Sequence, residues 1–156
     1  MTNDYYPLMG KALVEAKKGL EKGEVPVGAL IAGSDGEILA KAHNQPISLR
    51  DPTAHAEILA LRAAGIRCSN YRLEDAILIV TVEPCAMCMG AALNARIARL
   101  VFGCFDPKSG AAGSLYDLSS DDRLNHKIEV ISGIREEECR NLIQDFFKAR
   151  RIEKKE

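Results

Sequence analysis

The middle of the chain carries an apolar pattern that strongly constrains its fold. Residues 75–84, DAILIVTVEP, form an almost continuous apolar and β-branched run, which is typical of a strand buried on both faces. Residues 85–96, CAMCMGAALNAR, are rich in small residues and predict a helix, and residues 99–105, RLVFGCF, predict a second strand. A strand, a helix and a strand in this order form a right-handed crossover between parallel strands. The pattern therefore predicts an α/β fold.

The N-terminal part of the chain supplies further elements. Apolar residues recur every four positions over residues 6–23 and predict an amphipathic helix. Residues 25–33 and 37–44 predict two strands joined by the turn sequence SDG, and therefore a hairpin. Residues 45–52, QPISLRDP, are predicted to form a loop, after which Thr53 is placed to cap a helix that Gly65 would end.

After the second central strand, a long loop is predicted over residues 106–126, with a short helix at residues 115–118. Residues 127–133 predict a fifth strand, and a final helix is expected to begin near Ser132. Its buried face is expected to contain Cys139, Leu142, Ile143 and Phe146. Together these elements predict a three-layer α/β/α sandwich around a five-stranded mixed sheet.

The composition fits one soluble domain. At 156 residues, 47% hydrophobic and 28% charged, without repeats or linkers, we expect residues 1–156 to form a single domain with a basic C-terminal helix. No apolar run approaches the ~20 residues that span a bilayer, and the start lacks a secretory signal, so we expect a cytoplasmic protein without a membrane partner. Because the net charge is -1, any nucleic-acid contact must be local, and the candidate is KARRIEKKE at residues 148–156.

Three residues have side chains that zinc prefers: His55, Cys85 and Cys88. Three protein ligands leave the fourth tetrahedral position open for water, as a catalytic zinc requires. The C-x-x-C pair alone is a weak signal, because a redox pair, half of a structural clip or chance would also produce it. Neither His43 nor His126 has a cysteine or histidine at a clip-like spacing, so a closed site lacks its fourth ligand. The remaining cysteines are interpreted as core residues or bystanders: Cys68, Cys104 and Cys139.

The spacing of the candidate ligands constrains how their helices meet. Cys85 and Cys88 share one face in the first turn of a helix, whose N-terminus favours both thiolates. His55 and Glu57 point roughly 200° apart on a regular helix. They can share a site only near the helix axis at its N-terminal end, so two helix N-termini should face each other across the metal. Since zinc lowers the pKa of bound water to about 7 and a carboxylate can carry the proton, Glu57 indicates hydrolytic chemistry.

The pattern HAE followed by PCAMC resembles the signature of the zinc-dependent nucleoside and nucleobase deaminases. The segments EKGEVPVGAL, DPTAHAEILAL, VTVEPCAMCMGA, DPKSGAAGSLYDL and DFFKARR extend this resemblance, over nearly the whole chain, to the bacterial tRNA-specific adenosine deaminases. The resemblance implies a cytidine-deaminase-like fold and a homodimer that hydrolyses the wobble adenosine of a tRNA anticodon to inosine. It also implies one Zn²⁺ per subunit, held by His55, Cys85 and Cys88, and no organic cofactor. Glu57 would protonate ring N1 and then help ammonia leave.

The resemblance further implies residues that contact the tRNA anticodon stem-loop. Asn44 matches a base-contacting asparagine, and Asp106 matches an aspartate near the target ribose, followed by Lys108 and Ser109. Without the resemblance, Asn44 and Asp106 would be interpreted as ordinary turn residues.

At the C-terminus, Phe147 matches an aromatic residue that touches a base flanking the target, although it could equally continue a buried stripe with Phe146. Arg150 and Arg151 are the candidate phosphate contacts. Basic residues at the end of this helix would also complement the helix dipole without any RNA.

Two other functions use the same residues. A small-molecule deaminase acting on guanine, cytosine or a cytidine nucleotide would need the same metal group and Glu57. A non-enzymatic, zinc-stabilised binding protein would need the ligands but would have no use for Glu57. Asn44, the loop that begins at Asp106 and the basic C-terminal helix favour the RNA substrate over a small molecule, and the presence of Glu57 counts against the binding protein.

Overall fold

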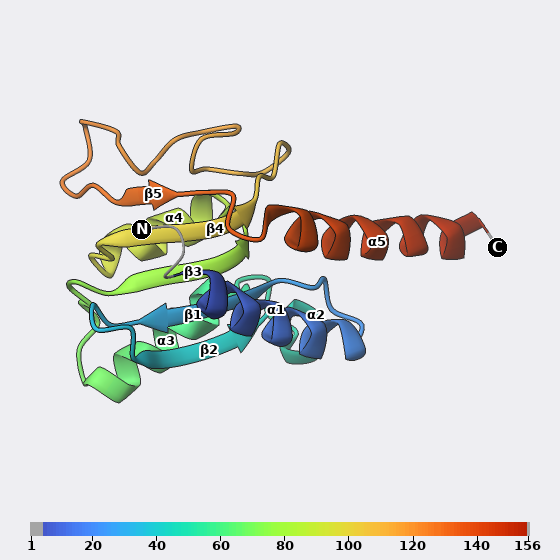
Figure 1. The fold of residues 1–156 in the computed structure, drawn as a ribbon, viewed down its shortest axis with the longest axis horizontal. Coiled ribbons are helices and arrows are strands. Elements are labelled where there is room, and N and C mark those ends of the chain that lie inside the picture. The colour runs from blue at the N-terminus through green and yellow to red at the C-terminus, as the bar shows by residue number, and fades with distance from the viewer. Residues whose placement is uncertain (1–4, 156) are drawn as a thin grey trace.

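A computed structural model describes residues 5–155 of the chain. Its strands form one sheet in the order β2-β1-β3-β4-β5 (Figure 1). They are β1 (Gly28–Ala32), β2 (Ile38–His43), β3 (Ile77–Val82), β4 (Arg99–Cys104) and β5 (Glu129–Ile131). The helices are α1 (Tyr6–Glu21), α2 (Pro46–Leu49), α3 (Ala56–Cys68), α4 (Ala86–Asn94) and α5 (Glu136–Lys155).

The sheet is mixed, as the sequence predicts. Strand β1 pairs antiparallel with both β2 and β3, which confirms the hairpin. Strands β3, β4 and β5 pair in parallel, and α4 connects β3 to β4, which confirms the central crossover. Every residue of β3 is buried, in agreement with its continuous apolar sequence.

Helices cover both faces of the sheet and give the predicted three layers (Figure 1). Gly28 of β1 donates its N–H to the Thr81 hydroxyl, and the register of β3 and β4 continues this row to Gly103. A Cβ atom on Gly28 would lie 1.9 Å from the Ala12 carbonyl of α1, and one on Gly103 would lie 2.3 Å from Cys139 of α5. Residues in one row point to the same face, so α1 and the start of α5 share a layer, and α3 and α4 form the other.

The boundaries of α3 differ from the prediction. His55, not Thr53, is the N-cap, because the Thr53 hydroxyl donates to Asp51 instead. The helix also continues through Gly65 and ends where Ser69 adopts a left-handed conformation with a φ of 52°. Glycine is tolerated inside a helix, and here it does not end one.

Three other local predictions are wrong. Helix α2 lies in the segment predicted as a loop, because the Glu24 carboxylate accepts N–H bonds from Ile47 and Ser48 at the start of α2. Residues 115–118 form no helix, since the loop turns back on the Gly110 carbonyl. Helix α5 begins at Glu136, not near Ser132, because Gly133 and Arg135 both have positive φ.

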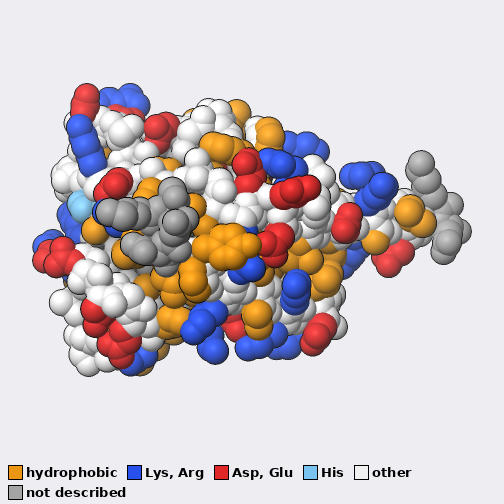
Figure 2. Space-filling view, in the orientation of Figure 1, with side chains coloured by type: hydrophobic (Ala, Val, Ile, Leu, Met, Phe, Trp, Pro, Cys, Tyr) orange, Lys and Arg blue, Asp and Glu red, His pale blue; other side chains and the backbone are white. Residues whose placement is uncertain are grey.

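Helix α5 packs its first turns on β4 and then projects beyond the body of the protein (Figure 1). Figure 2 shows basic and acidic side chains interspersed over one face of the molecule and on the projecting helix. The mixture agrees with the small net charge and indicates that any basic site is local. Within residues 5–155, no helix is both long enough and apolar enough to cross a membrane.

Candidate active site

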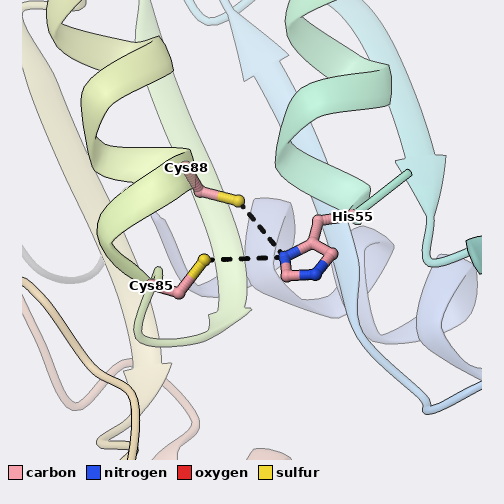
Figure 3. Close-up of side chains that lie close together, drawn as sticks. All are labelled: His55, Cys85 and Cys88. Carbon is pink, nitrogen blue, oxygen red and sulfur yellow. Dashed lines mark hydrogen bonds between the residues drawn. The ribbon is translucent and has the colours of Figure 1, made fainter. Parts of the chain in front are cut away.

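Two helix N-termini meet at one edge of the sheet, as the ligand spacing predicts. His55 is the N-cap of α3 and Cys85 is the N-cap of α4, both with extended backbone, while Cys88 lies in the first turn of α4. Their side chains point toward one another from the two helices (Figure 3). Residues that are 30 positions apart in the sequence are therefore brought into one group.

The donor atoms of this group have a spacing that fits zinc. The Nδ1 atom of His55 lies 3.6 Å from the Cys85 sulfur and 3.4 Å from the Cys88 sulfur (Figure 3). All three donor atoms lie within 4.8 Å of one another. A tetrahedral ion with Zn–S of ≈ 2.3 Å and Zn–N of ≈ 2.0–2.1 Å would hold a sulfur and a nitrogen about 3.5 Å apart. The group is thus preorganised for a tetrahedral metal with one position left open.

Electrostatics in this group favour a cation. The hydrogen bond with Cys88 lowers the pKa of Cys85 to about 4, although burial acts in the opposite direction. The same pairing raises the pKa of Cys88, so the two sulfurs share one negative charge. The hydrogen bond with Cys85 raises the pKa of His55. Both helix N-termini add their dipoles to the stabilisation of thiolate.

Glu57 lies in the first turn of α3 and lines the same cleft as His55 and Cys85. Only 4% of the residue is exposed. Burial raises the pKa of the Glu57 carboxyl to about 7, because a buried carboxylate loses its hydration. A carboxyl with this pKa can both accept and donate a proton near neutrality.

Asn44 follows β2 and stabilises the N-terminus of α3. Its side-chain Oδ1 accepts the Ala56 N–H at 2.7 Å. This N–H lies in the first turn, where it has no hydrogen-bond acceptor within the helix. Because the oxygen faces this donor, the amide NH₂ is the group left for other partners. Asn44 lines the cleft beside His55 and Glu57, so the structure brings the predicted base contact to the predicted metal group.

The cleft has a volume of about 1170 Å³ and extends from the metal group to α5. Asp106, Lys108 and Ser109 line one wall, and the Asp106 carboxylate accepts the N–H groups of Lys108 and Ser109 at 3.1 and 3.3 Å. Asp106 therefore forms the predicted turn and also lines the cleft. The two interpretations of this residue are compatible.

One face of α5 forms the far wall of the cleft. Phe147 lies on this wall and is 45% exposed, whereas Phe146 is partly buried and does not line the cleft, although the two rings contact each other edge-on. Arg150 and Arg151 line the cleft as well. The Arg150 guanidinium also lies over the Phe146 ring and donates to the Gly23 carbonyl at 2.8 Å, which ties α5 to the end of α1.

Several residues near the site were not identified from the sequence, among them Arg140 and Glu83. Arg140 lines the cleft, and its spacing of seven from Phe147 would have placed it on the same helical face. Glu83 is buried and accepts hydrogen bonds from the loop after β4. No local pattern identifies Glu83, because its partners lie 23 to 31 positions further along the chain.

This fold and this group define a zinc-dependent deaminase class. The family model described as the cytidine and deoxycytidylate deaminase zinc-binding region matches residues 2–104, which contain all the candidate ligands and Glu57. A tRNA-specific adenosine deaminase of Bacillus subtilis (strain 168) is 47% identical over 147 residues, covering 94% of this chain and 91% of that protein. The chain belongs to the family of tRNA-specific adenosine deaminases.

Two solved structures place the fold among its relatives. One comes from a study of A-to-I editing by tRNA:A34 deaminases at the wobble position of transfer RNA. It matches with a TM-score of 0.83 and 42% identity, covering 86% of this chain and 96% of that chain. A guanine deaminase from Bacillus subtilis matches with a TM-score of 0.59 and 37% identity, covering 62% of each chain.

Proposed function

We propose that the chain converts adenosine at wobble position 34 of a tRNA anticodon to inosine by hydrolysis, in agreement with the function of its relatives. The observation that carries the proposal is the continuity of one cleft. It joins the metal group and Glu57 to the basic and aromatic face of α5. A free base needs only the inner part of such a cleft, whereas a nucleotide within an RNA loop needs both parts.

The reaction consumes water and releases ammonia, as the bond between C6 and the exocyclic nitrogen breaks and a C6–O bond forms. When bound by His55, Cys85 and Cys88, Zn²⁺ supplies a Lewis acid that lowers the pKa of water. Glu57 accepts the first proton of the attacking water and delivers it to ring N1, and it then accepts the second proton from the new C6 hydroxyl and passes it to the departing amino group. Its pKa of about 7 suits each of these transfers at neutral pH.

The remaining cleft residues bind and orient the RNA. The Asn44 NH₂, whose direction is fixed by the bond from Ala56 to its oxygen, donates to the target base. Asp106, Lys108 and Ser109 contact the target ribose and its phosphate, and Phe147 stacks on a flanking base. The basic residues Arg150 and Arg151 contact phosphates.

The proposal includes the state of the whole protein. Residues 1–156 act as one deaminase domain in the cytoplasm, where its tRNA substrate is found, with one zinc per subunit and two subunits per molecule. Exposed apolar side chains on the small helix α2, Ile47 at 63% and Leu49 at 51%, support a subunit contact. The assembly is checked by light scattering, which should give twice the 17.0 kDa mass of one chain.

The proposed activity is tested by incubating the protein with an anticodon stem-loop that carries adenosine at the wobble position. Guanine, cytosine and cytidine serve as parallel substrates. We expect inosine in the RNA and no product from the three small molecules. Release of a guanine- or cytidine-derived product without conversion of the RNA would assign the chain to the small-molecule deaminases instead. Zinc binding without any turnover would leave only a binding function.

A further inference from the structure

Glu83 is a buried carboxylate that the proposed chemistry does not use. It lies between β3 and the N-cap of α4, directly before Pro84 and Cys85, and only 3% of it is exposed. Its main-chain N–H donates to the Cys104 carbonyl at 2.9 Å, which fixes it at the ends of β3 and β4. Within residues 5–154 its carboxylate forms no ion pair. A buried charge of this kind is costly unless hydrogen bonds compensate it.

The loop of residues 106–114 provides that compensation. One carboxylate oxygen accepts the Asp106 N–H at 2.9 Å and the Ser114 hydroxyl. The other accepts the N–H groups of Ala112 and Ser114, each at 3.0 Å. Hydrogen bonds to a charged acceptor are the stronger kind. The loop is therefore wrapped around Glu83 at its beginning and again where it returns.

The same loop is pressed onto the backbone that carries a metal ligand. Ala111 donates its N–H to the Pro84 carbonyl at 2.8 Å, and Gly110 forms an isolated β-bridge with Cys85. A Cβ atom on Gly110 would lie 2.3 Å from the carboxyl carbon of Glu83, so the loop approaches as closely as glycine allows. The loop therefore contacts both the Glu83 carboxylate and the backbone of the metal ligand Cys85.

We propose that Glu83 is a positioning residue for the substrate. It fixes the cleft wall made by Asp106, Lys108 and Ser109 relative to Glu57 and the metal ligands. Glu83 also lines the cleft, but both of its carboxylate oxygens are occupied by hydrogen bonds from the loop. The inference rests on the proposed function, because that function makes this wall a binding surface. According to this inference, Glu83 determines how far the part of the cleft that binds the nucleotide lies from the part that performs the chemistry.

The test is the Glu83→Gln variant with the wobble-adenosine stem-loop as substrate. The glutamine amide replaces one acceptor oxygen by an NH₂ that faces main-chain donors, so the loop must move. We expect KM to rise about tenfold, with kcat within about twofold and zinc content unchanged, because the loop contributes binding and a shift of about 1 Å can cost up to 10²-fold.

Two companion variants keep the test decisive if Glu83→Gln folds poorly. Gly110→Ala keeps the carboxylate and pushes the loop away from it, so it should raise KM in the same way. Asp117→Asn is the matched control: Asp117 follows that loop in the chain, accepts hydrogen bonds from Ser119 and Ser120, and does not line the cleft. We expect its KM to stay within about twofold of the unaltered protein, as for a surface site.

Hydrogen exchange separates loop position from catalysis. The N–H groups of Asp106, Ala112 and Ser114 should exchange faster in Glu83→Gln and remain protected in Asp117→Asn. An unchanged KM despite faster exchange would overturn the inference, as would loss of zinc or an equal rise of KM in the control. Failure of the proposed function is recognised separately, because the unaltered protein would then not convert the RNA at all.

Discussion

At the scale of single residues, two buried glutamates, Glu57 and Glu24, have pKa values shifted in opposite directions. Removal from water raises the pKa of Glu57 to about 7. Hydrogen bonds from Ser48 and Ile47 lower the pKa of the buried Glu24 despite its desolvation. Both residues have little exposed surface, and they differ in the hydrogen-bond donors that surround the carboxylate. Hydrogen bonds from fixed N–H groups keep Glu24 ionised, while Glu57 is suited to change its protonation state.

Replacing Glu57 by glutamine should abolish turnover and keep the metal. The amide has nearly the same shape but cannot carry a proton, so we expect kcat to fall about 10²- to 10⁴-fold, the usual contribution of a general acid and base. Zinc per chain, measured by elemental analysis, should not change, because the ligands His55, Cys85 and Cys88 are intact.

The matched control for this change is Glu24→Gln, which also neutralises a buried carboxylate but lies outside the cleft. We expect it to lower the melting temperature without a comparable loss of rate, since it removes acceptors for the start of α2. A near-normal rate in Glu57→Gln, with zinc bound, would show that another group moves the protons.

Residues with local signatures could be predicted from the sequence. His55, Cys85 and Cys88 stand at helix starts, where spacing alone restricts how they meet, and the structure brings them together. Glu83 and Glu24 could not be found this way. Their donors come from segments 23 to 31 positions away, so their importance depends on the tertiary fold.

At the scale of elements, α5 serves both the fold and the cleft. Its first turns pack Cys139 against β4, and the following turns present a basic and aromatic face to the cleft. Acidic residues occupy its first turn, which complements the helix dipole. The observed charge distribution would therefore stabilise the helix itself and would also favour contact with phosphate. Binding experiments are needed to distinguish these two roles.

The double variant Lys148→Ala/Arg151→Ala should weaken RNA binding and reduce its salt dependence. Both residues line the cleft, and neither is the arginine that ties α5 to Gly23. If each contacts one phosphate, the slope of log K against log salt should fall by roughly 0.7 per residue, or about 1.4 in total. Binding of the stem-loop is measured by fluorescence anisotropy over a range of salt concentrations.

The control removes the same charge elsewhere. Lys11 and Lys17 are exposed on α1 and outside the cleft, so Lys11→Ala/Lys17→Ala should leave the slope nearly unchanged. If the α5 variant also keeps the full slope while its helix becomes less stable, the basic residues serve the helix dipole and not the RNA.

Most elements were predictable because their periodicity is strong, and the exceptions have physical causes. Helix α2 has only four residues and is held by Glu24, which precedes it by more than twenty positions. Helix α3 runs through Gly65 because its packing on β1 and β2 outweighs the weak helix preference of glycine. The loop after β4 has no periodicity, and hydrogen bonds to Glu83 determine its path.

At the scale of the whole molecule, the metal group joins α3 and α4 over an otherwise complete core. The sheet and its helices bury a continuous apolar cluster that includes Leu30, Leu78, Ile79, Leu100 and Phe102. Zinc fingers lack such a core and unfold without their metal. This chain should therefore remain folded after the metal is removed. The contact between the two helix N-termini should become less stable, because the metal no longer neutralises the thiolate charge there.

Removal of zinc by a chelator should lower the melting temperature and leave the far-ultraviolet circular dichroism nearly unchanged. A ligand present at about 100 times its Kd contributes about 2.7 kcal/mol. For a chain of this size that corresponds to roughly 5–11 °C, at 2–4 °C per kcal/mol. Cys68→Ala alters an exposed cysteine remote from the group and should keep the full shift, whereas Cys85→Ala should lose it. Cooperative unfolding on chelation would instead mean that the core is not sufficient, because the metal would then be holding the two helices in place.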